Sequence, residues 1–316
     1  MVGRLSLAVS IPVLAVLIAA PLRAQDPGGG TPTHAAGKGA KAKADKPKDG
    51  KVAQHELPTD GNRAAGIHRA NRMFESRVMT ADGKDVGKVA DLVLDPSDGR
   101  VQYAVLDAGS FLDARGKLFA VPVDALVGDT GSAHLRLVGI DRAALAAAPA
   151  FAKTEWPKDG DRDFVAKVWK QFGRKPYWDD KATGFTTMRL GTLLHAPLTN
   201  AKGEELGKID NFAVDVLHGK LLYAIVHPSA STQAGEKAGE KGSDPNKGAS
   251  AQTDRRVAVP WAALAKGATG RELVLDMDAA HFMTAPGFET GKWPEMSDAK
   301  WVADNADFFT GAGAAR

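Results

Sequence analysis

The sequence contains no cysteine, which excludes structural disulfides, thiolate zinc sites and cysteine nucleophiles. It also lacks a strong excess of either charge, since 41 Lys and Arg residues face 38 Asp and Glu residues and leave a formal net charge of +3. Loss of a leader that contains Arg4 and Arg23 would reduce this charge to +1 (+3 minus 2). A broad basic field is therefore missing, and we expect no nucleic-acid partner.

Long apolar runs are absent except for one at the N-terminus, residues 5–20. Arg4 precedes this run and Ala24 follows it, an order typical of a signal peptide, so we predict a cleaved signal peptide over 1–24 and a periplasmic or secreted protein. The run is shorter than the roughly 20 residues that a spanning helix needs. The alternative is an uncleaved anchor in the inner membrane formed by residues 5–20.

Residues 25–72 are rich in Gly, Pro, Ala and Lys and show no apolar period. Such a composition predicts a disordered linker. Scattered lysines in this linker also allow contact with an anionic membrane surface, so membrane contact through the N-terminal segment or the basic linker stays open.

An internal repeat organises the rest of the chain. The stretch Gly83–Asp107 returns without a gap, 120 positions later, as Gly203–His227. Alternating apolar residues and turn residues in each stretch predict a small β unit that has been duplicated in tandem. Matching positions include Gly83/Gly203, Gly87/Gly207, Lys88/Lys208, Gly99/Gly219, Tyr103/Tyr223 and Ala104/Ala224.

Local signals predict the elements of the first unit. Strands are expected over 77–80, 86–94, 101–106, 118–123 and 135–138, and Asp141 is expected to cap a helix over 142–147. Within the second strand, Gly87 predicts a bulge or a close backbone approach, and Gly207 predicts the same in the second unit. Asp107, at the end of a strand, is expected to pair with a backbone amide.

The second unit has gained about 18 residues relative to the first, and we predict an exposed loop over the low-complexity insert 228–256. A helical connector is predicted over 158–182 and a helical tail over 295–316. Aromatic and apolar residues recur at helical spacing in both and predict packing on a barrel: Phe164, Val165, Val168, Trp169 and Phe172 in the connector, and Trp301, Val302 and Phe309 in the tail. We expect the two units to pack as an internal pseudo-dimer through these helices.

Both units resemble the PRC-barrel, the small β-barrel of the photosynthetic reaction-centre H subunit and of the ribosome maturation factor RimM. The resemblance is carried by Asp82–Val89, Asp91–Asp95, Gly99–Asp107 and Ala120–Leu126, and again by Lys202–Ile209, Asn211–Asp215, Gly219–Val226 and Ala258–Leu264. It implies a mainly β fold of two tandem barrels, at 73–157 and 183–294, each followed by a short helical tail. It further implies a docking module with no shared catalytic residues.

Motifs that would indicate chemistry are weak. Gly83–Lys88 has three residues between its glycines where a phosphate-binding loop needs four, and Asp91, Asp95 and Asp98 do not follow the spacing of a calcium loop. Two histidines, His195 and His227, could meet in the second unit but do not form a ligand set. We therefore assign no catalytic, cofactor-binding or metal-binding residue.

We expect a non-enzymatic exported binding or scaffold protein that docks on a protein partner in the cell envelope. The alternative is a membrane-tethered accessory subunit of an electron-transfer or envelope complex. An enzyme acting on an envelope substrate is a further alternative, and it would need a polar pocket with convergent carboxylates between the barrels.

Overall fold

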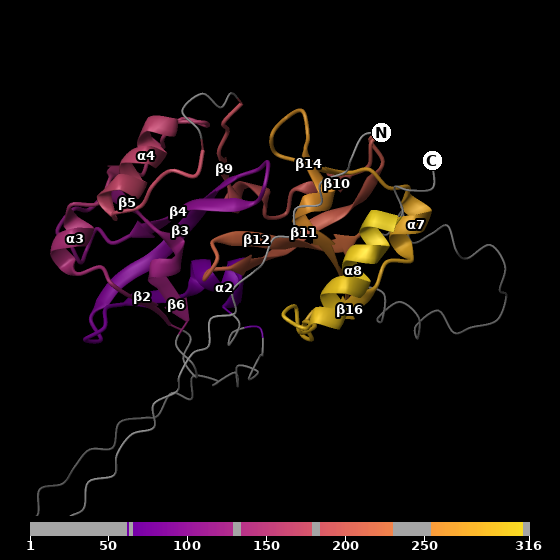
Figure 1. Ribbon diagram of the computed structural model, residues 1–316, viewed down its shortest axis with the longest axis horizontal. Helices are drawn as coiled ribbons and strands as arrows, with labels where there is room; N and C mark the ends of the chain where they lie inside the picture. The colour runs from indigo at the N-terminus through magenta and orange to yellow at the C-terminus, as the bar shows by residue number, and fades with distance from the viewer. Residues whose placement is uncertain (1–61, 63–65, 129–133, 179–183, 230–253, 312–316) are drawn as a thin grey trace, which may run out of the picture. The chain divides into compact units, whose positions relative to one another are not determined.

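The computed structural model describes residues 62, 66–128, 134–178, 184–229 and 254–311. The predicted signal peptide, most of the predicted linker and most of the predicted insert lie outside the described residues. The fold is mainly β with short helices (Figure 1). We call residues 66–178 the first half and residues 184–311 the second half.

The strands of the two halves pair in the same way. Each half has a long antiparallel hairpin, β3 with β4 or β11 with β12, flanked by shorter strands. In each half the first short strand of the unit also pairs in parallel with a later one, β2 with β7 and β10 with β15. The first-half strands are β2 (Arg77–Met79), β3 (Asp85–Asp95), β4 (Arg100–Asp107), β5 (Lys117–Val121), β6 (Leu126–Gly128), β7 (Leu135–Leu137) and β8 (Ala150–Ala152). The second-half strands are β10 (Pro197–Thr199), β11 (Glu205–Asp215), β12 (Lys220–Pro228), β13 (Arg255–Pro260), β14 (Leu264–Lys266), β15 (Leu273–Leu275) and β16 (Gly287–Glu289).

The predicted close approach at the glycines is present. Gly87 has a φ of +136°, and a Cβ placed on it would lie 2.0 Å from the carbonyl oxygen of Asp107 on β4. A Cβ on Gly207 would lie 2.3 Å from the carbonyl oxygen of His227 on β12. Only a residue without a side chain lets the two strands of each hairpin come this close.

Each half begins with a short leading segment that pairs with the other half. These segments are β1 (Ile67–Arg69) with helix α2 (Ala70–Glu75), and β9 (Met188–Arg189) with the 3₁₀ helix η2 (Leu190–Leu193). Strand β1 pairs with β11 of the second half, and strand β9 pairs with β3 of the first. The exchange is reciprocal, and one buried apolar core runs through both halves.

This exchange corrects the predicted linker 25–72 and the predicted start of the first barrel at residue 73. Residues 66–72 belong to the folded core, where Ala70 is fully buried and Met73 of the same helix is 1% exposed. The apolar residues of this segment are too few to show a period, so sequence pattern missed them. The boundaries of the predicted insert 228–256 are also too wide, because β12 extends to Pro228 and β13 begins at Arg255.

Four helices and two 3₁₀ turns complete the described chain: α3 (Arg142–Ala146), α4 (Arg162–Gln171), α7 (Ala279–Met283), α8 (Ala299–Gly311), η1 (Val123–Ala125) and η4 (Trp261–Ala263). The side chain of Asp141 accepts a hydrogen bond from the backbone N–H of Ala144, which is the predicted cap of α3. None of the helices in the described part of the chain is long and apolar enough to cross a membrane.

The trailing helices α4 and α8 pack on their own halves (Figure 1). Val165 and Val168 of α4 are buried against first-half strands, and the Trp301 ring of α8 meets the Tyr223 ring at 5.2 Å. The prediction that the halves join through these helices is therefore wrong, because the leading segments and the hairpin turns join them. Val302 also differs from its prediction, since it is 36% exposed.

Candidate functional site at the junction of the halves

The turns of the two long hairpins meet at the junction, which we define as the set of contacts between the first and second halves. The N–H of Val101 donates to the carbonyl of Gly219 at 2.8 Å, and the N–H of Leu221 donates to the carbonyl of Gly99 at 2.8 Å. These two bonds are equivalent under the internal repeat. They extend the hydrogen bonding of one hairpin into the other, with Lys220 of β12 paired to Arg100 of β4.

In each long strand, one buried side chain accepts hydrogen bonds from the leading segment of the other half. Asp91 of β3 accepts the N–H of Gly191 at 2.8 Å through Oδ1 and the Nε–H of Arg189 at 3.0 Å through Oδ2. Asn211, the equivalent residue of β11, accepts the N–H of Asn71 at 3.2 Å. Burial raises the pKa of Asp91, although the bonds from Gly191 and Arg189 oppose this rise.

Two arginines of the leading segments cover tryptophans of the other half. The guanidinium of Arg189 lies 3.6 Å from the centre of the Trp156 ring, and that of Arg69 lies 4.4 Å from the centre of the Trp293 ring. A guanidinium over an indole face gains about 0.5–2 kcal/mol, depending on exposure. The two stacks add a second reciprocal contact to the junction.

A polar cluster surrounds the first hairpin turn. The Tyr177 hydroxyl donates to Oδ2 of Asp95 at 2.6 Å and accepts from Nε2 of Gln102 at 2.7 Å. Burial and the bond to Asp95 raise the pKa of Tyr177, so this hydroxyl stays protonated as a donor at neutral pH. Sequence reasoning missed the role of Tyr177, because nothing in the spacing links it to a turn that precedes it by about 80 residues.

Asp98 of the same turn bonds to both halves. Its Oδ2 accepts from Nζ of Lys220 at 2.9 Å and from Nε of Arg100 at 3.4 Å. Partial burial opposes ionisation, but the hydrogen bonds and positive charges of Lys220 and Arg100 together outweigh it, so the pKa of Asp98 lies below its ordinary value. Asp91, Asp95 and Asp98 are thus bonded to protein groups and do not converge on a metal position.

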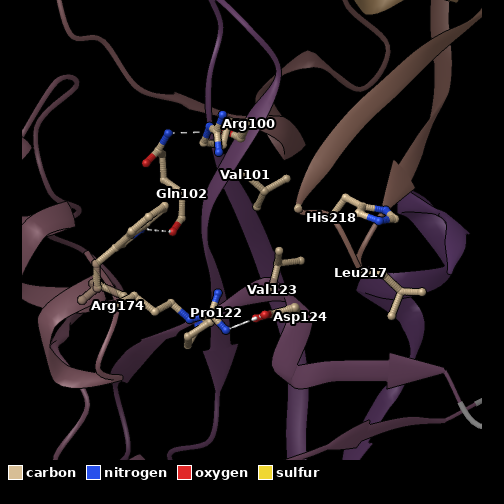
Figure 2. A pocket seen from close by; sticks show the side chains of 12 residues that line it. Arg100, Val101, Gln102, Pro122, Val123, Asp124, Arg174, Leu217 and His218 are labelled. Carbon is tan, nitrogen blue, oxygen red and sulfur yellow. Dashed lines mark hydrogen bonds and ion pairs between the residues drawn. The ribbon is translucent and has the colours of Figure 1, made fainter. Parts of the chain in front are cut away.

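A cavity of about 150 Å³ lies beside this turn (Figure 2). Val101 and Val123 line it from the first half, and Leu217 lines it from the second half. The guanidinium of Arg174, which is bonded to the carboxylate of Asp124, closes one end. The remaining lining residues are Arg100, Gln102, Pro122, Val168, Trp169, His218 and Gly219.

The equivalent space on the other side of the junction is filled. Trp261 of η4 stands where Val123 of η1 stands in the first half, and its indole packs on the turn glycine Gly99. A Cβ on Gly99 would lie 2.6 Å from Cδ1 of Trp261, whereas a Cβ on Gly219 would lie 3.4 Å from Val123 and 3.9 Å from the carbonyl oxygen of Val101. The cavity lies where a valine replaces an indole.

The remaining candidate residues do not converge. The described residues contain no group of three or more His, Asp or Glu side chains that could hold a metal ion. The carboxylate of Asp107 accepts a hydrogen bond from Nζ of Lys153 at 2.6 Å. The partner is therefore a lysine side chain and not the predicted backbone amide. Residues 83–88 lie in a turn and in β3 rather than ahead of a helix, as expected for a segment that is no phosphate-binding loop.

Comparison with known families agrees with this architecture. The family model of the PRC-barrel domain matches residues 66–137, which include the first leading segment and the strands β2 to β7. The chain is a PRC-barrel domain protein. No curated protein matches it.

Proposed function

We propose that this chain is a non-enzymatic, exported docking protein built from two PRC-barrel domains that form an internal pseudo-dimer. The supporting observation is that charged residues at the junction form contacts between the two halves. Buried Asp91, the stacked Arg189 and the doubly bonded Asp98 all brace one half against the other. This arrangement suits a rigid scaffold that presents two barrel surfaces in a fixed relation.

The partner we propose is a protein of the cell envelope. Export rests on the signal-like N-terminal sequence, and docking rests on the fold, since a braced pair of barrels offers broad surfaces and no convergent carboxylates in the described residues. The outer face of the junction exposes apolar side chains, with Leu217 at 50% and Tyr177 at 36%. Exposed apolar residues of this kind are common in protein interfaces.

Photo-crosslinking in the native cells tests this function. A photoreactive residue at Leu217 should capture one reproducible protein, whereas the same residue at Val302, on the outer side of α8, serves as the matched control. Intact-mass analysis of the recovered chain should show loss of residues 1–24. A cleaved chain that captures no protein from either position would contradict the docking function.

The alternative function, a membrane-tethered accessory subunit of an electron-transfer or envelope complex, is favoured only by the apolar run at residues 5–20. The same mass analysis separates the two functions. A full-length chain recovered with the membrane fraction would replace the exported docking protein with the tethered subunit.

A further inference from the structure

We infer that the junction cavity is a binding site for one planar aromatic ring, of the indole class. The inference starts from the internal repeat, which supplies two versions of the same place. In the version next to Gly99, the chain fills the space with its own indole, Trp261. In the version next to Gly219, the chain provides Val123 instead and leaves a cavity.

The size of the cavity fits this ligand class. Its volume is about 150 Å³. An apolar cavity of roughly 150 Å³ in another protein binds benzene, so the space suffices for a single ring. Neither a sugar chain nor a dinucleotide fits in this volume, since pockets for drug-sized ligands begin at about 300 Å³.

The chemistry of the walls points to the same class. Val101, Val123 and Leu217 supply apolar groups to a lining that also contains charged and polar side chains. The guanidinium of Arg174 at one end is held in place by Asp124, and guanidinium groups stack well on aromatic faces. A flat ring can contact both these apolar groups and the guanidinium of Arg174.

The filled version also shows which polar bond a ligand ring would make. The indole N–H of Trp261 donates to the carbonyl of Pro96 at 3.2 Å. The residue equivalent to Pro96 in the second half is Val216, which lies in the turn between β11 and β12. Gln102 is also among the lining residues, and its side-chain oxygen is buried without a hydrogen-bond partner among the described residues. A ring with an N–H donor is the ligand that corresponds to Trp261 of the filled version.

Two sources could supply such a ring, a free indole-like small molecule or the side chain of a tryptophan in another protein. The residues of the cavity specify only the aromatic ring that both sources have in common. Binding measured with indole and with N-acetyl-tryptophanamide separates the sources, because the second compound carries the peptide groups that a side chain in a protein brings with it. Binding of both compounds supports the side chain, and binding of indole alone supports the free ring.

The internal repeat provides a matched pair of variants. Val123→Trp should fill the cavity as Trp261 fills its counterpart, raise the Tm and weaken indole binding at least tenfold. Trp261→Val should lower the Tm and open a second cavity, which raises the stoichiometry from one indole per chain to two. Val123→Phe, a smaller ring, serves as the filling variant if the tryptophan does not allow folding.

Calorimetric titration of the wild type and these variants with indole decides the question. The expected result is one indole site in the wild type that Val123→Trp or Val123→Phe removes. An absence of indole binding by the wild type, with binding by Trp261→Val in the same titration, would overturn the inference. Indole binding that survives unchanged in both filling variants would also overturn it, since the ring would then lie elsewhere.

Discussion

Replacing Gly87 by alanine tests the close approach of β3 and β4, on which the first half depends. A methyl group at this position would lie 2.0 Å from the carbonyl oxygen of Asp107, far inside van der Waals contact. The clash is with backbone, so no side-chain rotation relieves it. The φ of +136° adds a second penalty, because L residues rarely adopt this conformation.

The expected cost is the sum of three effects. Strain at this φ costs about 1–3 kcal/mol, and overpacking costs about 1–3 kcal/mol. Displacement of the Asp107 carbonyl from the β3–β4 ladder costs about 1 kcal/mol more. We therefore expect Gly87→Ala to reduce the free energy of unfolding by about 3–7 kcal/mol, a large part of the roughly 5–15 kcal/mol of a typical domain.

Two other glycines serve as controls. Gly83 also has a positive φ, +79°, but a Cβ there would meet nothing within 4 Å, so Gly83→Ala should cost only about 1–2 kcal/mol. Gly207→Ala carries the clash, at 2.3 Å from the carbonyl of His227, and should fall between the two. Urea denaturation followed by circular dichroism measures all three. A cost for Gly87→Ala within about 1 kcal/mol of that for Gly83→Ala would refute the argument, because the clash would then contribute nothing.

Three further predictions concern the junction and the insert. Asp91→Asn should fold. Its free energy of unfolding should rise relative to that of the wild type as the pH rises through the raised pKa of Asp91, because the wild type must then bury a charge. Below about pH 4 the two free energies of unfolding should differ no further. In contrast, Asn211→Asp should lose about 3 kcal/mol at pH 7, and equal unfolding midpoints for the two variants at pH 7 would contradict the burial argument. Gly99→Ala should lower the Tm more than Gly219→Ala, because an indole rather than a valine packs on the first glycine; thermal melts of both variants check the order, and a reversed order would contradict it. Replacement of residues 230–253 by a short Gly-Ser loop should leave the Tm within a few degrees, because loop closure costs little with length; loss of the cooperative transition would contradict a loop role for this insert.

The strands could be predicted from the sequence because their signals are local. Alternating apolar residues locate β3 and β4, and the turn residues between Asp95 and Gly99 locate the hairpin. The close approach at Gly87 was also predictable, because a glycine inside a strand pattern has few other reasons to be there. The cap at Asp141 followed from a local rule in the same way.

The junction could not be predicted, because its contacts join distant positions and use few residues. Three residues of β1 are too short for any period, yet they pair with β11, which lies about 145 residues further along the chain. The sequence assigned no role to Asp91 once its spacing excluded a calcium loop, whereas the structure gives it Arg189 and two backbone amides as partners. The cavity was visible in the sequence only as the mismatch of Val123 with Trp261, a signal that acquires meaning once the structure places both residues on equivalent turns.

An engineered disulfide between β1 and β11 reports on the reciprocal exchange of the leading segments. Ile67 of β1 lies opposite Asp215 of β11. Directly opposed residues of antiparallel strands have Cα atoms about 4.5–5.5 Å apart, within the range for a disulfide. The chain has no other cysteine, so the double variant Ile67→Cys/Asp215→Cys can form only one intramolecular bond.

Mild oxidation of this variant, followed by mass spectrometry of the unreduced protein, gives the answer. Pairing of β1 with β11 predicts a monomer with a single internal disulfide and a raised Tm, while each single-cysteine variant stays reduced or forms only slow dimers. Free thiols after oxidation, or disulfide-linked dimers as the main product of the double variant, would contradict it. In the first case β1 would not pair with β11, and in the second it would pair with another copy of the chain.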